Sequence, residues 1–321
     1  MSEPLAIGVD IGGTKLRVAV VDAEGRILER RRAGTPAGDA EGLVAALCAV
    51  ITDVGQGRLP VGVGIAGLVT ADGTVRYGPN IGVRDLPLAD ELHQVTDGRV
   101  VVVNDASAAT FGEQRFGAGR GASDLVLLTL GTGVGGGVVV GGRLLLGRGG
   151  FAGEVGHLIV AEGGRTCPCG NQGCLEAYAS GTAIGSRARE RLVDLTVVST
   201  LREVRDPSGP QVSAAAAEGD AFARSILEDA GRWLGVGAAS LTNALDPELL
   251  LVGGGAAQAT APWLLPAARK SLQSHLVGSQ WREAPRIELA TLGDDAGVIG
   301  AALLAAEHVQ GRITVPTGLD R

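Results

Sequence analysis

One histidine and three cysteines near the middle of the chain form its most chemically specific pattern. They are His157, Cys167, Cys169 and Cys174. Three thiolates and one imidazole match the ligand set of a tetrahedral structural zinc ion. The Cys-x-Cys-x4-Cys spacing differs from the paired Cys-x2-Cys of zinc ribbons, so unliganded or redox-active thiols stay open as alternatives. Cys48 lies apart in an apolar helical pattern and is expected to be a core residue.

A disulfide is the other common fate of neighbouring cysteines. The N-terminal residues show no basic stretch followed by an apolar run and a cleavage site, so we expect no secretion signal. The expected location is therefore the reducing cytoplasm, where clustered cysteines bind metal more often than they pair. On these grounds the sequence favours a zinc site over a disulfide.

Two glycine turns form the second chemical pattern. Asp10–Lys15 reads DIGGTK and brings a carboxylate, flexible backbone donors and a hydroxyl to the end of an apolar run. A phosphate with bound magnesium requires these groups, although Asp-x-Gly-Gly is also a common tight turn. Gly131–Gly133 reads GTG and follows a similar run. Both turns lead into a second β-branched run, which predicts strand-turn-strand units rather than the strand-to-helix turn of dinucleotide sites and P-loops. We interpret the two units as a weak internal duplication that brings both turns to one polyphosphate.

Several acidic residues are candidates for acid–base chemistry. Asp105 follows a buried strand and could take a proton from an attacking hydroxyl, but it could equally cap the next helix. Glu154 and Glu176 flank the histidine and cysteine cluster, and their alternative is solvated surface. One nitrogen of His157 could bind zinc while the other faces a substrate. The glycine run that begins at Gly253 could open a helix or face a flat base.

The elements that position these groups alternate between strands and helices, which indicates an α/β fold. A chain of 321 residues is long for one core and suits two domains with a cleft between them. The net charge of −7 argues against a nucleic-acid surface, and no apolar run reaches the length of a membrane span. Many of the 52 glycines follow apolar strands, which suggests tight turns or close ligand approach. Strands are expected at 5–10, 16–22, 61–66, 100–103, 124–130 and 249–252, and helices at 40–54, 106–115, 181–193, 220–244 and 296–308.

In chain order, the segments DIGGTK, NDA, GTGVGGG, E-x-G-H, CPCGNQGCLE and VGGG resemble the repressor, open-reading-frame and kinase (ROK) family of sugar kinases. Within that family the chain is most similar to the bacterial glucokinases. The resemblance implies an actin-like, ribonuclease H-like fold of two α/β domains. Residues 1–105 with 297–321 would form the smaller domain, and 106–296 the larger one with the zinc motif. ATP, Mg²⁺ and a structural Zn²⁺ are implied, with phosphorylation of the 6-hydroxyl of glucose.

The resemblance also implies roles for individual residues, with Asp105 as general base. Sugar contacts would come from Gly67, Asn80, Asn104, Asp105, Glu154, His157 and Glu176, and zinc ligands from His157, Cys167, Cys169 and Cys174. The phosphates and metal would lie among Asp10, Gly12, Gly13, Thr14, Lys15, Gly131, Thr132 and Gly133, and adenosine against Gly253 and Gly254. Ser107 stands where the family usually has asparagine, and Gly82-Val83-Arg84 where many members have tryptophan.

Three alternatives remain. The first is a kinase for another sugar: N-acetylmannosamine, N-acetylglucosamine, fructose or allose. A second is a sugar-responsive repressor, which would need a helix-turn-helix region before the turn at Asp10, where we expect no room. Polyphosphate as donor is the third, although the turn at Gly253 favours a nucleotide. We expect a sugar and ATP as partners, no nucleic acid or membrane, and a homo-oligomer, either a dimer or a tetramer.

Overall fold

The computed structural model describes residues 3–55 and 59–312, and the chain folds as two compact units. Unit 1 comprises Met1–Ser123, Gly137–Gly153 and Asp294–Arg321, and unit 2 comprises Asp124–Gly136 and Glu154–Gly293. These boundaries differ from the expected ones, because the helix α3 (Asp105–Phe116) belongs to unit 1. Of the expected segment 297–321, residues 313–321 lie outside the described residues, as do residues 1, 2 and 56–58 of the segment 1–105.

The sheet of unit 1 has five strands in the order β3-β2-β1-β4-β8. The chain first forms an antiparallel meander, and β4 and β8 then continue the sheet in parallel with β1. β4 consists only of buried residues, as expected for a central strand covered on both faces, whereas β3 alternates and lies at the edge. The bounds are β1 (Pro4–Ile11), β2 (Lys15–Asp22), β3 (Ile27–Gly34), β4 (Val61–Ile65) and β8 (Val100–Asn104).

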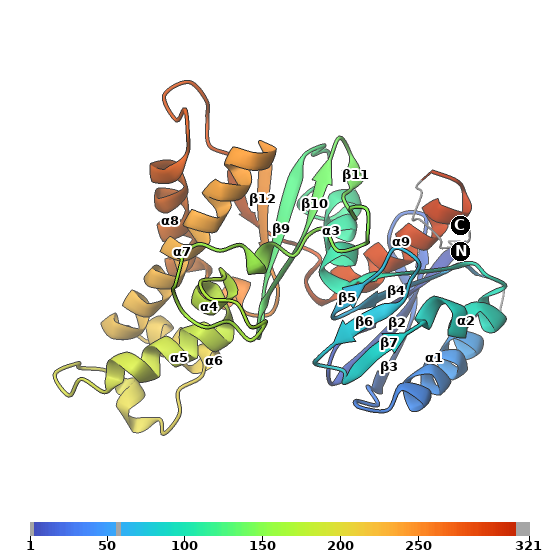
Figure 1. The fold of residues 1–321 in the computed structure, drawn as a ribbon, viewed down its shortest axis with the longest axis horizontal. Coiled ribbons are helices and arrows are strands. Elements are labelled where there is room, and N and C mark those ends of the chain that lie inside the picture. Colours follow the sequence, from blue (N-terminus) through green and yellow to red (C-terminus); the bar gives the residue numbers. More distant parts are fainter. Residues whose placement is uncertain (1–2, 56–58, 313–321) are drawn as a thin grey trace. The chain divides into compact units, whose positions relative to one another are not determined.

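Helix α9 (Ala296–Val309) lies directly on this sheet, and glycines allow the close approach (Figure 1). A Cβ atom on Gly8 would lie 1.8 Å from the carbonyl oxygen of Val298, and one on Gly62 would lie 1.8 Å from that of Ala301. Gly300 allows α9 to contact α3 equally closely. This contact explains why α3 belongs to unit 1. The unit also holds α1 (Ala40–Gly55), α2 (Leu88–Thr96) and a small antiparallel sheet of β5 (Leu68–Val69), β6 (Val75–Gly78) and β7 (Val83–Leu86).

The second sheet has the strand order β11-β10-β9-β12-β13. Its strands β9 (Leu125–Leu130), β12 (Leu249–Gly253) and β13 (Arg286–Leu289) are parallel and belong to unit 2. β10 (Val134–Val140) returns from β9 through the second glycine turn and leads to the short β11 (Arg143–Leu144). The division between the units falls within β10, after Gly136.

The helices of unit 2 include a long pair, α7 (Ala221–Leu245) and α8 (Ala257–His275) (Figure 1). Their axes come close because α7 has glycine at the contact: a Cβ atom on Gly231 would lie 2.3 Å from the carbonyl oxygen of Leu264. The remaining helices are α4 (Glu176–Ala179), α5 (Gly181–Leu192) and α6 (Gly209–Ala217). Among the described residues, the helices are too short or too polar to cross a membrane.

Candidate active site

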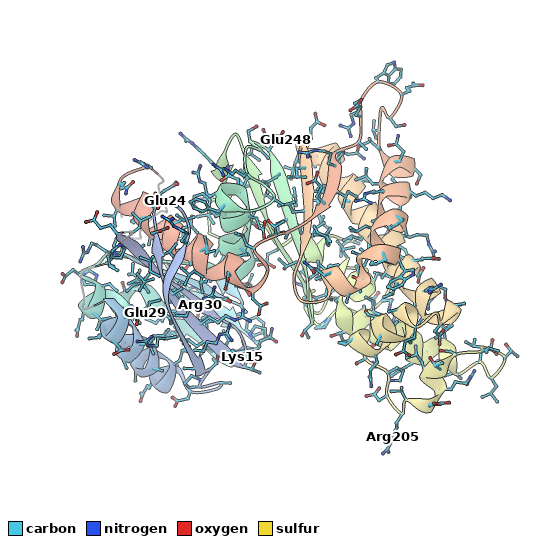
Figure 2. All side chains as sticks on the ribbon, turned by 180° about the vertical axis from the view of Figure 1, so that it is seen from behind. Lys15, Glu24, Glu29, Arg30, Arg205 and Glu248 are labelled. Carbon is cyan, nitrogen blue, oxygen red and sulfur yellow. The ribbon has the colours of Figure 1, made fainter. Side chains whose placement is uncertain are left out.

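The first glycine turn joins β1 to β2, as the sequence predicted. The backbone N–H of Gly12 donates to the carbonyl of Lys15 at 3.0 Å and closes the turn, and the Thr35 hydroxyl donates to the carbonyl of Gly12 at 2.7 Å. A Cβ atom on Gly13 would lie 2.8 Å from the carbonyl oxygen of Asn80, so Asn80 lies against the turn. Lys15 is exposed at the start of β2 (Figure 2) and pairs with no carboxylate in the described part of the chain. The turn therefore offers a lysine, a threonine and backbone donors together.

Asp10 lies directly opposite Arg17 in the β1–β2 pair. Arg17 Nη1 donates to Asp10 Oδ2 at 3.1 Å. Burial raises the pKa of Asp10 above its ordinary value, while the charge and hydrogen bond of Arg17 oppose that shift. Gly297, in the first turn of α9, leaves room for the carboxylate, because a Cβ atom there would lie 3.1 Å from Asp10 Cγ.

Asn104 and Asp105 end β8 and begin α3. The N-cap is Asn104, whose Oδ1 accepts from the backbone N–H groups of Ala106 and Ser107 at 2.9 and 3.0 Å. Its Nδ2 donates to the carbonyl of Gly67 at 3.2 Å. Asp105 is the first helical residue and is half-buried, and its Oδ1 also accepts from Ala106 N–H at 2.9 Å. The cap is thus supplied mainly by Asn104, whose side chain also contacts Gly67.

The four predicted zinc ligands of unit 2 lie together. All four candidate ligand atoms are within 4.8 Å of one another. Cys169 Sγ is 3.6 Å from Cys174 Sγ, and Cys167 Sγ is 3.7 Å from His157 Nδ1. The cysteines are free, since a disulfide would bring its sulfurs to about 2.05 Å. Bonds of about 2.3 Å to one tetrahedral zinc place sulfurs about 3.8 Å apart, so the cluster fits that ion.

Glycines shape the loop that carries the cysteines. Gly170 has φ of +96° in a turn where the backbone N–H of Cys167 donates to the carbonyl of Asn171 at 2.8 Å. A Cβ atom on Gly173 would lie 1.8 Å from the carbonyl oxygen of Ala161. Both glycines of the CPCGNQGC segment therefore have a backbone reason to be glycine.

The predicted sugar-binding side chains of unit 2 surround this cluster. Glu154 Oε2 lies 3.8 Å from His157 Nε2. Glu176 Oε1 lies 3.5 Å from Cys167 Sγ, and its Oε2 accepts from the backbone N–H of Val134 at 2.9 Å. Burial raises the pKa of Glu154, and the charge of Glu176 adds to the shift while His157 opposes it. Glu176 thus links the cysteine loop to the second glycine turn.

The two glycine turns of unit 2 are neighbours at the carboxyl ends of β9 and β12. In the Gly131–Gly133 turn, the N–H of Gly131 donates to the carbonyl of Gly133 at 3.0 Å. Gly254 has φ of +87°, and a Cβ atom there would lie 2.4 Å from the carbonyl oxygen of Leu130. At Gly181, the first residue of α5, the N–H donates to the carbonyl of Gly131 at 2.8 Å. A helix N-terminus beside a glycine turn favours bound anions.

Each unit gathers its own share of the predicted residues. Unit 1 brings together the first turn, Gly67, Asn80, Asn104 and Asp105. Unit 2 brings together the glycine turns at Gly131–Gly133 and Gly253–Gly254, the cysteine cluster and the two flanking glutamates. A model of the ROK family matches residues 6–308.

The chain belongs to the ROK family.

Other ROK proteins resemble this chain over nearly its whole length. The glucokinase of Streptomyces coelicolor is 39% identical, with 94% of this chain and 98% of the relative covered. The N-acetylmannosamine kinase of Escherichia fergusonii is 33% identical, with 93% and 97% covered. The crystal structure of the ROK glucokinase of Streptomyces griseus with glucose and AMPPNP has a TM-score of 0.81 at 42% identity and covers 94% of this chain and 99% of that one. The family and the α/β, actin-like fold expected from the sequence are therefore confirmed.

Some residues that contact the candidate site were not predicted from the sequence. Arg17 could have been found, because a hairpin that turns at Gly12–Thr14 places it opposite Asp10. Gly181 and its N-cap Ser180, whose Oγ accepts from the N–H of Ala183 at 3.0 Å, had no distinctive motif. Their contact with the second turn depends on the tertiary fold.

Proposed function

We propose that this chain is an ATP-dependent kinase that transfers the γ-phosphoryl group of ATP to the 6-hydroxyl of glucose. One observation carries the proposal: Glu154, His157 and Glu176 gather around the cysteine loop, and Glu176 also accepts the N–H of Val134 beside the second glycine turn. Groups suited to sugar hydroxyls therefore adjoin groups suited to phosphates. The related Streptomyces griseus glucokinase, which was crystallised with glucose and AMPPNP, supports this assignment.

Amide, carboxylate and imidazole groups bind the sugar by accepting hydrogen bonds from its hydroxyls or donating hydrogen bonds to them. Charge-assisted bonds from carboxylates fix a hydroxyl more firmly than neutral ones. We assign this role to the side chains of Asn80, Asn104, Glu154, His157 and Glu176 and to the backbone of Gly67. Asn104 is fixed for this role, because its oxygen caps α3 and its Nδ2 bonds to Gly67.

Asp105 acts as the general base. It orients the 6-hydroxyl toward the γ-phosphorus and accepts its proton as the new oxygen–phosphorus bond forms, while the bond from the γ-phosphorus to the bridging oxygen breaks and ADP leaves. Its place at the first position of α3, held by the bond from Ala106 N–H, gives the carboxylate a fixed direction. Because little covalent chemistry is required of the protein, positioning supplies most of the rate.

The phosphates of ATP are bound by the glycine turns. The N–H groups of Gly12 and Gly131 close these turns, so the backbone N–H groups of Gly13 and Gly133 and the side chains of Thr14, Lys15 and Thr132 are the groups that would bind the phosphates. The N-terminus of α5 adds its dipole. Adenosine lies against Gly253 and Gly254. Magnesium, which Asp10 and Thr14 would help to hold, supplies positive charge against the phosphate oxygens.

A zinc ion bound by the histidine and the three cysteines supplies structural rigidity to the loop that precedes Glu176. The zinc ligands take no part in proton transfer. We also propose that the protein binds zinc and magnesium, lies in the cytoplasm and forms a homo-oligomer, either a dimer or a tetramer.

A kinase of N-acetylmannosamine is the second candidate, favoured by the related enzyme of Escherichia fergusonii. Glucose and N-acetylmannosamine differ at the second carbon of the sugar, where N-acetylmannosamine carries an acetamido group in the opposite configuration, so the shape of the pocket around that carbon would discriminate between them. The residues Gly82-Val83-Arg84, two positions beyond Asn80 in the sequence, stand where many family members have tryptophan.

The deciding experiment measures ADP formation by the purified protein with ATP and magnesium against a set of sugars. The set is glucose, fructose, allose, N-acetylglucosamine and N-acetylmannosamine, and the phosphorylated carbon is identified by NMR. We expect the highest kcat/KM for glucose and a 6-phosphate product. A higher kcat/KM for N-acetylmannosamine would establish the second candidate. Absence of sugar-dependent ADP formation throughout, with polyphosphate also inactive as donor, would refute the kinase proposal.

A further inference from the structure

Arg17 connects the first glycine turn to the start of α9. It stands on β2 directly opposite Asp10, so the two side chains share one face of the sheet. Arg17 Nη1 donates to Asp10 Oδ2 at 3.1 Å, and Nη2 donates to Asp294 Oδ2 at 2.9 Å. One guanidinium thus spans two carboxylates that are far apart in the sequence, which a single-point lysine ammonium cannot reproduce.

The carboxylate of Asp10 is confined by this contact. Its side chain is only 16% exposed, whereas that of Asp294 is 74% exposed. Within residues 3–55 and 59–312, Asp10 Oδ1 accepts no hydrogen bond. Gly297 bounds the carboxylate on the side of α9. Arg17 therefore engages only Oδ2 of Asp10 and holds the carboxylate beside the first turn of α9.

We propose that Arg17 is a positioning residue that holds the Asp10 carboxylate in the orientation required for binding magnesium and ATP at the first glycine turn. The proposal rests on the assignment of Asp10 to the phosphate site in the proposed function. Arg17 contacts neither phosphate nor sugar in this role. It acts through Asp10, with Asp294 anchoring the second arm of the guanidinium.

A purely structural role is the alternative, and the chain offers a matched control for it. Arg30, on β3 (Figure 2), makes two hydrogen bonds of 2.7 Å to Asp295, the neighbour of Asp294. Arg30 thus also attaches the start of α9 to the sheet, but it does not contact Asp10. Losing Arg30 should affect stability without affecting the carboxylate.

A second control addresses the loss of positive charge alone. Arg32, on β3, is the cross-strand partner of Arg17 on its other side. It is exposed and forms no ion pair in the described part of the chain. Arg32→Met removes the same charge from the adjacent strand and leaves Asp10 and its hydrogen bond intact.

The experiment compares Arg17→Met, Arg17→Lys, Arg30→Met and Arg32→Met in the full chain. Calorimetry measures the Kd for AMPPNP with magnesium, steady-state kinetics gives KM for ATP and for the sugar, and thermal unfolding gives Tm. We expect Arg17→Met to raise the Kd and the KM for ATP about 10-fold while the sugar KM stays within about 2-fold. Arg17→Lys, which keeps one ion pair, should raise them about 3-fold. Arg30→Met should lower Tm with an unchanged Kd, and Arg32→Met should change neither.

Two results would overturn the proposal. An unchanged or lower Kd for Arg17→Met would show that Arg17 is dispensable or competes with the cation for Asp10. An equal rise in Kd for Arg30→Met would assign the effect to the attachment of α9. Should Arg17→Met not fold, Arg17→Lys carries the same comparison. Failure of the wild-type protein to phosphorylate any sugar would refute the proposed function separately, because the nucleotide Kd is measured without turnover.

Discussion

Gly133 lies against the carboxylate of Glu176, and the absence of a side chain at Gly133 leaves the space that the carboxylate occupies. A Cβ atom on Gly133 would lie 2.2 Å from Glu176 Oε2. That oxygen accepts the N–H of Val134 at 2.9 Å, a bond between a backbone donor and a charged acceptor. A carbon and an oxygen cannot remain closer than about 3.2 Å without strong repulsion, so Gly133→Ala must displace the carboxylate by about 1 Å. The hydrogen bond to Val134 is then stretched or lost.

The displacement of the Glu176 carboxylate should lower activity by weakening the binding and positioning of the sugar. Loss of a hydrogen bond to a charged group costs about 1.5–3 kcal/mol, and a shift of about 1 Å in a substrate-positioning group can lower the rate about 100-fold. We therefore expect Gly133→Ala to raise the glucose KM at least about 10-fold and to lower kcat/KM for glucose by about 100-fold. Initial rates at varied glucose with saturating ATP measure both quantities.

Gly131 supplies the matched control, two residues away in the same turn. A Cβ atom on Gly131 meets no atom within 4 Å, and neither glycine has a left-handed backbone. Gly131→Ala should leave the glucose KM near the wild-type value and, if the turn binds ATP phosphates, should raise the KM for ATP. A wild-type glucose KM in Gly133→Ala would refute the role given to Glu176.

Three further predictions concern metal and stability. Metal analysis should find about one zinc ion per chain, with chelation lowering Tm, and an active, stable protein free of zinc would contradict the site. Burial alone would raise the pKa of Asp220, but hydrogen bonds from Ala223, Ser199 and Thr200 hold that pKa below its ordinary value. Its stabilisation is therefore fully present above the pKa of the unfolded carboxyl and is lost as pH falls through the lower folded pKa. Asp220→Asn should cost about 1 kcal/mol in urea unfolding at pH 7, and this difference should shrink as pH is lowered through the acid range; a difference that stays constant would contradict the assigned cause. Gly62→Ala should destabilise the protein by at least about 1–3 kcal/mol, because the new Cβ atom would overlap the backbone of Ala301. Gly34→Ala should be nearly neutral, because its Cβ atom would meet no atom within 4 Å. Equal free energies of unfolding for the two variants would contradict this packing.

The strand-turn-strand units could be predicted from the sequence because their signal is local. An apolar run, a glycine turn and a second apolar run define both β1–β2 and β9–β10, and the structure confirms them. Helix α8 was not predicted, since Pro262 and Pro266 lie inside it and proline normally ends a helix. Tertiary packing overrides that local preference.

The glycines show a second limit of sequence reasoning. The many glycines that follow apolar strands were expected to lie in turns or near ligands, but Gly8 and Gly62 lie within strands and allow the close approach of α9, which is distant in the chain. Similarly, the sequence left open whether Asp105 caps α3, and only the geometry assigns the cap to Asn104. The candidate site residues are proposed from the motifs, whereas the partners that orient them, such as Arg17, depend on strand register and packing.

The role of Asp105 as general base is tested most directly by two measurements on Asp105→Asn: the rate of glucose 6-phosphate formation and the Kd for glucose. Asparagine keeps the shape of the side chain and an oxygen that can accept from Ala106 N–H, but it cannot take up the proton of the hydroxyl. We expect kcat to fall by at least about 100-fold to 10,000-fold while the Kd for glucose changes less than about 3-fold. A variant that forms glucose 6-phosphate at the wild-type rate would contradict the account.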